Sequence, residues 1–214
     1  MSDCSKEAQG FFITLEGIEG AGKSTAVPVL AETARQLGYE VEVTREPGGG
    51  ELGERLRKIF LDPGLMLDAD EELLLLYAGR LDHIRKRILP ALVAGKVLIC
   101  DRFEDSTFAY QGGGRHVSLD RIDALSRWAG VKCRPDLTFW LDVSPEVGAY
   151  RIGFRDPDRL ERESPDFFRR AREVFGQRMN ADPGRFCRID AEAPLEEIRV
   201  RLQVELQNRL PGRT

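Results

Sequence analysis

The chain has 214 residues, enough for one compact domain with a full hydrophobic core. Hydrophobic residues make up 42% of the chain and charged residues 32%, which excludes a disordered or fibrous protein. The net charge of −4 argues against nucleic acid or a membrane surface as a partner, and no apolar run is long enough to span a bilayer. Residues 1–10 are polar and lack a signal-peptide core, so we expect a flexible tail there and a cytoplasmic protein.

Short apolar runs alternate with helical patterns along the chain. Strands that are separated by helices pair in parallel through right-handed crossovers. We therefore predict an α/β fold, a three-layer α/β/α sandwich around a parallel sheet of about five strands, in a single domain over residues 1–214. The predicted strands cover residues 11–15, 39–44, 96–100, 137–143 and 186–190. The predicted helices cover residues 25–37, 52–61, 70–94, 119–129, 146–153, 165–180 and 195–210.

Two prolines fall inside predicted helices and should disturb them, because proline has no N–H group to donate. Pro28 lies in the first helix, where we expect a mild kink or an irregular first turn. Pro90 should interrupt or bend the long helical region 70–94.

Residues 17–24 read GIEGAGKS, the pattern G-x-x-x-x-G-K-[ST], directly after the first predicted strand. In this context the glycines let the loop curl so that successive backbone N–H groups point at one anion, and the following helix adds its positive end. Lys23 would reach the β- and γ-phosphates, and Ser24 would offer an oxygen to Mg²⁺. The alternative, a glycine-rich turn without a ligand, is disfavoured by the preceding strand. The pattern predicts a P-loop NTPase fold with an ATP site at Gly17, Ile18, Glu19, Gly20, Ala21, Gly22, Lys23, Ser24 and Thr25.

Asp101 and Arg102 follow the hydrophobic run KVLIC. P-loop enzymes place at such a strand end the carboxylate that supports Mg²⁺, so we predict Ser24 and Asp101 as the metal site. The planar fork of Arg102 matches phosphate oxygens, which predicts a second phosphate site. A surface ion pair is the alternative for this motif.

Three arginines lie in the segment RIGFRDPDR, at about residues 150–160. With a glycine and a proline between them, Arg151, Arg155 and Arg159 are typical of a helical lid whose arginines reach a transferring phosphate. Their spacing of four residues also fits a solvated basic face of a helix, which is the alternative.

Five segments of the chain together resemble the thymidylate kinase (dTMP kinase) family. They are FFITLEGIEGAGKS, TREPGGG, DRFEDSTFAYQGGGR, RPDLTFWLDVSPEVG and DRLERESPDFFRR, and they follow one another in the order and spacing of that family. The resemblance runs from about Phe11 to Leu202, and DRFEDSTFAYQG is its most specific part. The chain is most similar to the bacterial type, which has an acidic residue in the P-loop, here Glu19, and catalytic arginines in the lid.

The resemblance implies transfer of a phosphoryl group from ATP to dTMP, giving dTDP for dTTP synthesis, with Mg²⁺ and in a homodimer. It implies catalytic roles for Lys23, Glu19, Arg102, Arg151 and Arg155, with Arg155 stabilising the transferring phosphoryl group. Arg102 would hold the dTMP phosphate, and Glu19 would lie near that phosphate and the 3′-hydroxyl. The implied dTMP-binding residues are Glu19, Arg45, Pro47, Arg57, Leu76, Arg80, Arg102, Thr107, Tyr110 and Gln111.

At the base, Arg80 would donate to thymine O4, because arginine only donates. Thr107 and Gln111 would contact the other polar edge of the base, and Tyr110 would pack under the sugar and disfavour a 2′-hydroxyl. Two side chains also have structural alternatives: Arg80 as a helix-surface arginine paired with Asp82 or Glu72, and Tyr110 as a core aromatic.

Three features depart from the family pattern: Pro28 in the P-loop helix, a compact lid that contains Asp156-Pro157, and the residue at position 76. Where the family usually stacks an aromatic on thymine, this chain has Leu76, so either Leu76 packs on the base or the neighbouring Tyr77 moves in. The apolar stretch 73–76, continued by Ile84 and Ile88, fits either a partner helix or the core of the monomer.

Two other functions remain open. A kinase of the same fold could use another nucleoside monophosphate or a deoxynucleoside, although a nucleoside acceptor would not need Arg102. A P-loop switch that signals would carry an NKxD-like segment, and the sequence has none.

Overall fold

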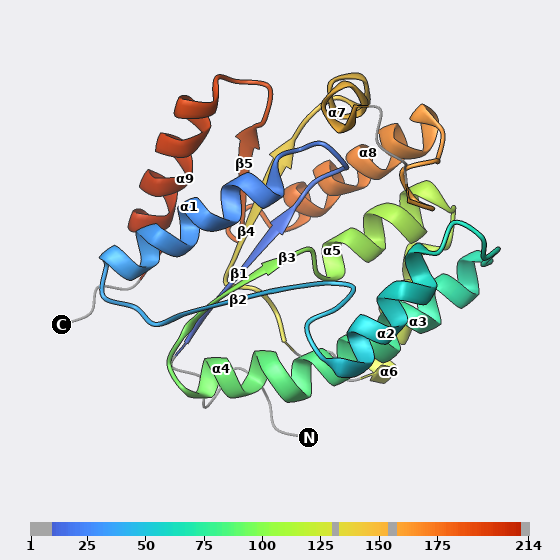
Figure 1. The fold of residues 1–214 in the computed structure, drawn as a ribbon, viewed down its shortest axis with the longest axis horizontal. Coiled ribbons are helices and arrows are strands. Elements are labelled where there is room, and N and C mark those ends of the chain that lie inside the picture. Colours follow the sequence, from blue (N-terminus) through green and yellow to red (C-terminus); the bar gives the residue numbers. More distant parts are fainter. Residues whose placement is uncertain (1–9, 130–132, 154–157, 211–214) are drawn as a thin grey trace.

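Five parallel strands form one sheet in the order β2-β3-β1-β4-β5. The computed structural model describes residues 10–129, 133–153 and 158–210 (Figure 1). The strands are β1 (Phe11–Glu16), β2 (Val41–Arg45), β3 (Val97–Asp101), β4 (Leu137–Asp142) and β5 (Phe186–Asp190). The predicted α/β fold with a five-stranded parallel sheet is confirmed. The second strand begins two residues later than predicted, because the N–H of Tyr39 still bonds the carbonyl of Ala34 in the preceding helix.

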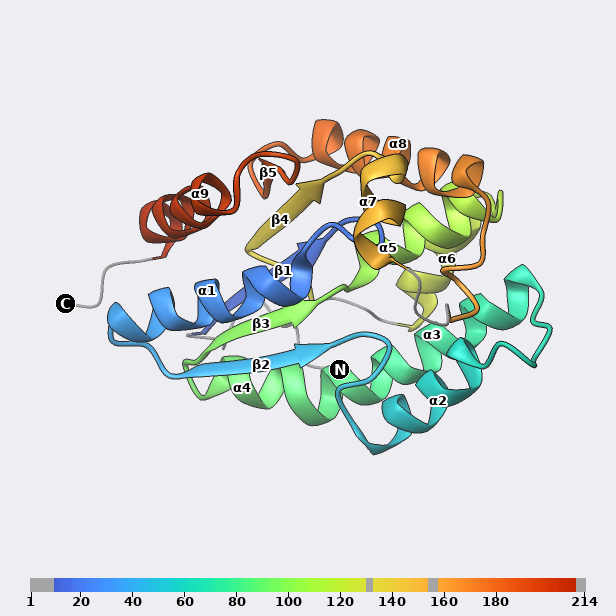
Figure 2. The same cartoon turned by 45° about the horizontal axis from the view of Figure 1, so that its top comes forward.

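Helices cover both faces of the sheet. On one face, α1 (Lys23–Gln36) and α9 (Leu195–Arg209) lie next to each other, as Figures 1 and 2 show. The other face is covered in part by η1, a π-helical turn (Ile84–Ile88), and α4 (Leu89–Val93). Alternating strand side chains supply both layers of the core. Ile13, Leu15, Val97 and Ile99 pack with Ala26, Leu30 and Ala31, whereas Phe12, Leu98 and Cys100 pack with Ile88, Ala91 and Leu92.

The long helical region begins with α3 (Ala69–His83) at a capping box. The Asp68 side chain accepts from the N–H of Glu71, and the Glu71 side chain accepts from the N–H of Asp68, both at 2.8 Å. The predicted interruption near Pro90 is the π-helical turn η1, which directly precedes α4. Because Pro90 cannot donate to the carbonyl one turn before it, the helix widens there.

The first helix lacks the irregular first turn that was one of the two expected effects of Pro28. It is one continuous α-helix from Lys23 to Gln36, and the N–H groups of Thr25 and Ala26 both bond the carbonyl of Gly22 at 3.0 Å. The first turn is therefore regular. Pro28 is exposed, so the missing bond falls on the solvent side of the helix, where water can take its place.

A helical segment that the sequence did not predict follows β3. It consists of α5 (Glu104–Thr107) and η2, a π-helical segment (Phe108–Gly114). Its three consecutive glycines are untypical of a helix. Gly113 and Gly114 allow close packing against α8 (Pro165–Ala181), and Gly112 packs against Leu119. A Cβ on Gly113 would lie 2.7 Å from the carbonyl oxygen of Arg170 in α8, so the two elements meet backbone to backbone.

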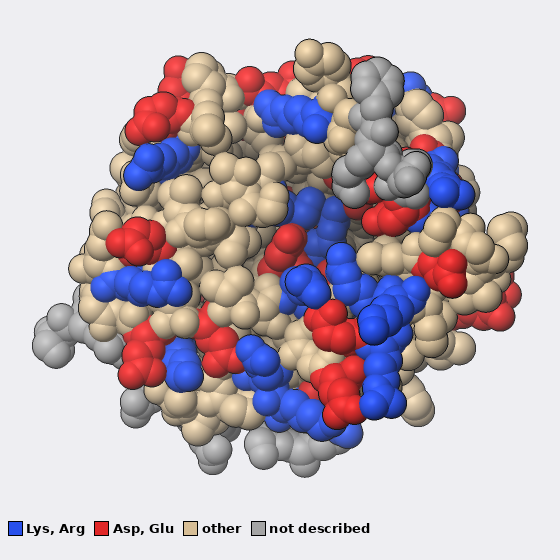
Figure 3. Space-filling view, in the orientation of Figure 1, with Lys and Arg blue, Asp and Glu red and all other residues tan. Residues whose placement is uncertain are grey.

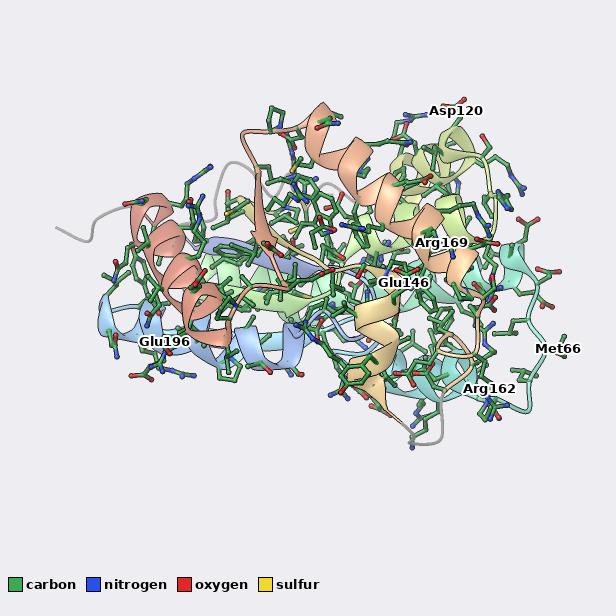
Figure 4. The ribbon with its side chains drawn as sticks, turned by 90° about the horizontal axis from the view of Figure 1, so that it is seen from above. Met66, Asp120, Glu146, Arg162, Arg169 and Glu196 are labelled. Atoms are coloured by element: carbon green, nitrogen blue, oxygen red, sulfur yellow. The ribbon has the colours of Figure 1, made fainter. Side chains whose placement is uncertain are left out.

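The remaining elements are α2 (Glu51–Leu61), α6 (Leu119–Ala129) and α7 (Pro145–Ile152). Figure 4 shows Met66, in the loop between α2 and α3, pointing away from the rest of the protein. Within the described ranges, no helix is both long enough and apolar enough to cross a membrane.

Candidate active site

A cavity of about 760 Å³ opens at the carboxyl ends of the strands, where ligands of parallel sheets bind. Figure 3 shows a hollow in this face with basic and acidic side chains on its walls. The P-loop, the segments after β2, β3 and β5, and parts of α3, η2 and α7 line it. All ten residues expected to bind the acceptor meet here: Glu19, Arg45, Pro47, Arg57, Leu76, Arg80, Arg102, Thr107, Tyr110 and Gln111.

The P-loop curls around Lys23, the first residue of α1. The Lys23 ammonium donates to the carbonyl oxygens of Gly17 (2.9 Å) and Ile18 (3.0 Å). Burial, together with the nearby charge of Arg102, lowers its pKa to about 8. From Glu19 to Thr25 the predicted ATP site lines the cavity, whereas Gly17 and Ile18 do not. Ile18 is instead a core residue. Both Gly17 and Ile18 hold the Lys23 ammonium through their carbonyl oxygens.

Two glycines allow the P-loop to lie in direct contact with α7. Gly20 has a φ of +74°, and a Cβ there would lie 2.2 Å from the carbonyl oxygen of Gly148. In the reverse direction, a Cβ on Gly148 would lie 2.5 Å from the carbonyl oxygen of Glu19. The loop and the helix therefore touch through their backbones alone.

The predicted metal residues, Ser24 and Asp101, line the same cavity. The Oδ1 atom of Asp101 is buried, and no residue in the described part of the chain donates a hydrogen bond to it. A buried carboxylate oxygen without a donor suits a hydrated cation, and a serine hydroxyl adjoining bound phosphates is an oxygen ligand of the kind Mg²⁺ uses. These residues therefore fit Mg²⁺.

Arg102 lies at the centre of a hydrogen-bonded cluster on the wall of the cavity. Its Nη2 donates to Oε1 of Glu19 (2.7 Å), its Nη1 donates to the carbonyl of Gly17 (2.8 Å), and its guanidinium lies 4.9 Å from the ring centre of Tyr110. The Tyr110 hydroxyl donates to the other Glu19 oxygen at 2.6 Å. Burial opposes the charge of Arg102, but Tyr110 and Glu19 raise its pKa, so the cation persists. The alternative of a surface ion pair is wrong, because Arg102 and Glu19 are largely buried. Tyr110 is a core aromatic, as the alternative for it held, with its ring against Phe167, and it also lines the cavity.

Two further arginines lie at the rim. Arg45 pairs with Glu54 at 2.9 Å, and the Nη1 of Arg57 donates to the carbonyl of Pro47 at 2.9 Å. Burial and the neighbouring charge of Arg45 lower the pKa of Arg57. A bound anion would relieve the repulsion between these two cations.

Glu16, the last residue of β1, supports the loop that carries Arg102. Its carboxylate accepts from the N–H of Phe103 (2.8 Å) and from the Ser106 hydroxyl (2.5 Å). Burial and the charge of Asp105 raise its pKa to about 7 from 4.5.

We expect Glu16→Gln to remove a pH dependence of folding. Because the folded state holds the Glu16 proton more tightly than the unfolded state, its contribution to stability is complete below about pH 4.5 and is lost as the pH rises through about 7. The shift corresponds to at most about 3 kcal/mol. Urea unfolding of both proteins at several pH values measures this difference. Parallel curves for the free energy of unfolding against pH would contradict it.

Arg80 is buried and extends from α3 to the far end of the cavity. Its Nε donates to Glu46 at 2.8 Å, and its Nη2 donates to Thr107 at 2.9 Å and to the carbonyl of Phe103 at 3.2 Å. Its Nη1 is buried and has no hydrogen-bond partner among the described residues. The structural alternative, a surface pair with Asp82 or Glu72, is wrong, because Glu46 holds this guanidinium. The Nη1 nitrogen of Arg80, with its two N–H groups, can thus donate to a ligand.

Leu76, not Tyr77, lines the cavity. Tyr77 is buried beside it, and its hydroxyl donates to Glu104 at 3.1 Å and to the carbonyl of Ile122 at 3.4 Å. Burial raises the pKa of Tyr77 above its usual value. The family's aromatic position is therefore occupied here by an aliphatic surface.

The three predicted lid arginines differ in their placement. Arg151, in α7, lines the cavity, and Arg155 lies outside the described residues. Arg159 does not line it: its Nε donates to the carbonyl of Phe60 (2.8 Å) and its Nη1 to Glu72 (2.5 Å). The expectation that Arg159 reaches a phosphate is wrong for this structure, because a buried carboxylate holds its side chain.

An ion pair connects α7 to α8. In Figure 4, Glu146 of α7 and Arg169 of α8 lie beside each other, with Oε1 of Glu146 3.7 Å from Nε of Arg169.

One end of the cavity was not predicted from the sequence. This end is largely apolar and is lined by α1, the segment after β5 and the start of α9, with Val29, Ala191, Ala193, Leu195, Ile198, Arg199 and Leu202. The sequence does contain an indication of this end, because residues 191–195 directly follow the fifth predicted strand, and ligands of parallel sheets bind at the carboxyl ends of strands.

The fold and the site define a class of protein. A P-loop and a separate arginine clamp open into one cavity, which is the arrangement of a P-loop kinase that phosphorylates a small phosphorylated acceptor.

Comparisons with known proteins agree. The sequence model of the family "Thymidylate kinase" matches residues 15–202. The chain is similar to the thymidylate kinase of Paracidovorax citrulli (46% identical, covering 95% of each chain) and to that of Pseudomonas fluorescens strain Pf0-1 (48% identical, covering 94% of this chain and 97% of the relative). The crystal structure of thymidylate kinase from Ehrlichia chaffeensis has a TM-score of 0.74 and 34% identity, covering 92% of this chain and 98% of that one. The chain belongs to the thymidylate kinase family, and it is a nucleoside monophosphate kinase.

Proposed function

We propose that this chain transfers the γ-phosphoryl group of ATP to dTMP, giving dTDP in the pathway to dTTP, and uses Mg²⁺. The observation that carries the proposal is the second anion site: Arg102 lies in the same cavity as the P-loop, so two phosphorylated molecules can meet there. Phosphoryl transfer needs positioning and charge neutralisation rather than covalent help from the protein.

On the donor side, the P-loop amides and Lys23 bind the phosphates of ATP. Ser24 and Asp101 hold Mg²⁺, which neutralises charge on the phosphate oxygens when it is bound. The apolar end of the cavity beside Val29 and Ile198 receives the adenine.

On the acceptor side, Arg102 binds the phosphate of dTMP with Arg45 close by, and Tyr110 packs under the sugar. Arg80 donates from its free Nη1 to the O4 of thymine, and Leu76 covers the base. The nearby residues Glu19, Pro47, Arg57, Thr107 and Gln111 complete this side. Arg151 and Arg155 stabilise the transferring phosphoryl group.

One assay tests the proposal: ATP consumption with dTMP, dUMP, UMP, dCMP, GMP and thymidine as acceptors. Strong preference for dTMP supports it. Preference for another acceptor would mean that dTMP is not the substrate. No turnover with any acceptor would favour a nucleotide switch.

We also propose a homodimer that pairs through the outward face of α3. In the monomer, Leu73, Leu76, Ile84 and Ile88 are buried in its own core. Leu74, however, is 61% exposed, and Trp128 of the neighbouring α6 is 81% exposed. Exposed large apolar side chains on adjacent helices are typical of an interface.

Leu74→Arg should convert the dimer into a monomer, because it places a charge in the apolar centre of that interface. Light scattering after gel filtration measures the mass. The matched control is Val200→Arg, since Val200 is 49% exposed on α9, away from α3. A dimer that survives the Leu74 change would contradict the assignment of this face.

A further inference from the structure

Glu72 is a buried carboxylate behind the base end of the cavity. Its side chain is 0% exposed, and it does not line the cavity. Donors of three residues converge on it: Nε2 of Gln111 on Oε2 (2.8 Å), and Nη2 of Arg115 (2.9 Å) and Nη1 of Arg159 (2.5 Å) on Oε1. The two guanidinium groups balance the buried charge.

The contact with Gln111 fixes the direction of an amide. An ionised carboxylate only accepts hydrogen bonds, whereas the two ends of a glutamine amide differ: the NH₂ donates and the oxygen accepts. Glu72 therefore holds the NH₂ end of Gln111, and the carbonyl oxygen must point away from Glu72. Because Gln111 lines the cavity, that oxygen is the acceptor it offers to a ligand.

This direction matters for the choice of base. Thymine and uracil carry an N–H at N3 and a carbonyl oxygen at C4, whereas cytosine has a bare acceptor at N3 and an amino group at C4. An acceptor fixed at Gln111 and the free donor of Arg80 match the first pattern and oppose the second. A glutamine free to rotate its amide could present either its oxygen to the N3–H of thymine or its NH₂ to the bare N3 of cytosine, so it would not distinguish the two bases.

We propose that Glu72 is a positioning residue for acceptor specificity: it fixes the Gln111 amide so that the site favours a thymine-type base over a cytosine-type base. The inference rests on the proposed dTMP kinase function and adds a residue that does not touch the substrate. Arg115 and Arg159 serve it by keeping the buried carboxylate paired.

The test compares kcat/KM for dTMP and dCMP in the wild type and in Glu72→Gln. A glutamine at this position can turn either end toward Gln111, so the ratio of the two values should fall roughly tenfold, the usual effect of one hydrogen bond. The loss should appear in KM for dTMP, while KM for ATP stays unchanged. The control is Glu163→Gln, because Glu163 pairs with Arg115 at 2.6 Å and has no contact with Gln111. An unchanged ratio in Glu72→Gln would overturn the proposal.

A double-mutant cycle separates positioning from general damage. If Glu72 acts through Gln111, Glu72→Gln should leave the ratio unchanged in a Gln111→Ala background. An equal effect in both backgrounds would refute the link. A wild type that does not phosphorylate dTMP would instead refute the proposed function, so the two failures differ.

Should Glu72→Gln fail to fold, the wild type still tests the proposal. In ¹⁵N-labelled protein, the side-chain NH₂ of Gln111, assigned with Gln111→Met, should show one proton protected from exchange before dTMP is added. Protection that arises only with dTMP would mean that the NH₂ faces the base, and the proposal would be wrong.

Discussion

Arg102→Ala should lower kcat/KM for dTMP by roughly 10³-fold and leave the Kd for ATP nearly unchanged. Two charge-assisted hydrogen bonds to the acceptor phosphate, at about 2 kcal/mol each, account for that factor. Arg102 pairs with Glu19 and lies over the ring of Tyr110, both of which belong to the acceptor side in the proposed function. Steady-state kinetics and calorimetric titration with ATP measure the two effects separately.

The control is Arg102→Lys, which keeps the charge but loses the planar fork that matches phosphate oxygens. It should recover only part of the activity. An equal loss of dTMP and ATP affinity in Arg102→Ala would show that the arginine serves the P-loop through its bond to the Gly17 carbonyl instead.

Asp105→Asn should destabilise the fold by about 3–5 kcal/mol, because it breaks a buried ionic cluster. The Asp105 carboxylate accepts from Arg185 at 2.6 and 3.1 Å and from Arg178 at 2.8 Å. These bonds connect α5 to α8 and to the start of β5. An asparagine would take away the carboxylate that pairs with Arg178 and would leave Arg185 with Asp182 alone, at 2.8 Å. Urea unfolding at neutral pH measures the loss.

The matched control is Asp123→Asn, which breaks an exposed pair with Arg127 in α6 and should change stability by less than about 0.5 kcal/mol. The pH dependence offers a second check. Burial acts against the charge of Asp105, but hydrogen bonds from Arg185 and Arg178 lower its pKa below 3.8. Its contribution is thus present above about pH 3.8 and is lost as the pH falls through the folded-state pKa. Equal stability losses in both variants would contradict the cluster's role.

Much of the site could be predicted from the sequence because phosphate chemistry constrains it locally. A P-loop needs its glycines, lysine and serine at fixed spacing, and strand ends identify the neighbouring loops. The same rule holds for the apolar end of the cavity, because Ala191 and Leu195 follow the fifth strand.

Other features depend on contacts that sequence spacing does not reveal. The helical segment over residues 104–114 contains three glycines, which have low intrinsic helix propensity, and it is held by packing against α8. Arg159 has the spacing of a lid arginine, yet a buried glutamate 87 residues away in the sequence holds it. Neither outcome follows from local pattern alone.

The backbone contact between Gly20 and Gly148 limits which substitutions this enzyme can tolerate. Gly20 is required for its positive φ as well as for space, whereas Gly148 sits in a helix and is required for space alone. A single added methyl group at either position would force the loop that holds Lys23 and the helix that carries Arg151 apart. In a saturation library, both positions should therefore tolerate only glycine, and alanine at Gly148 should impair donor binding even though it is a good helix former.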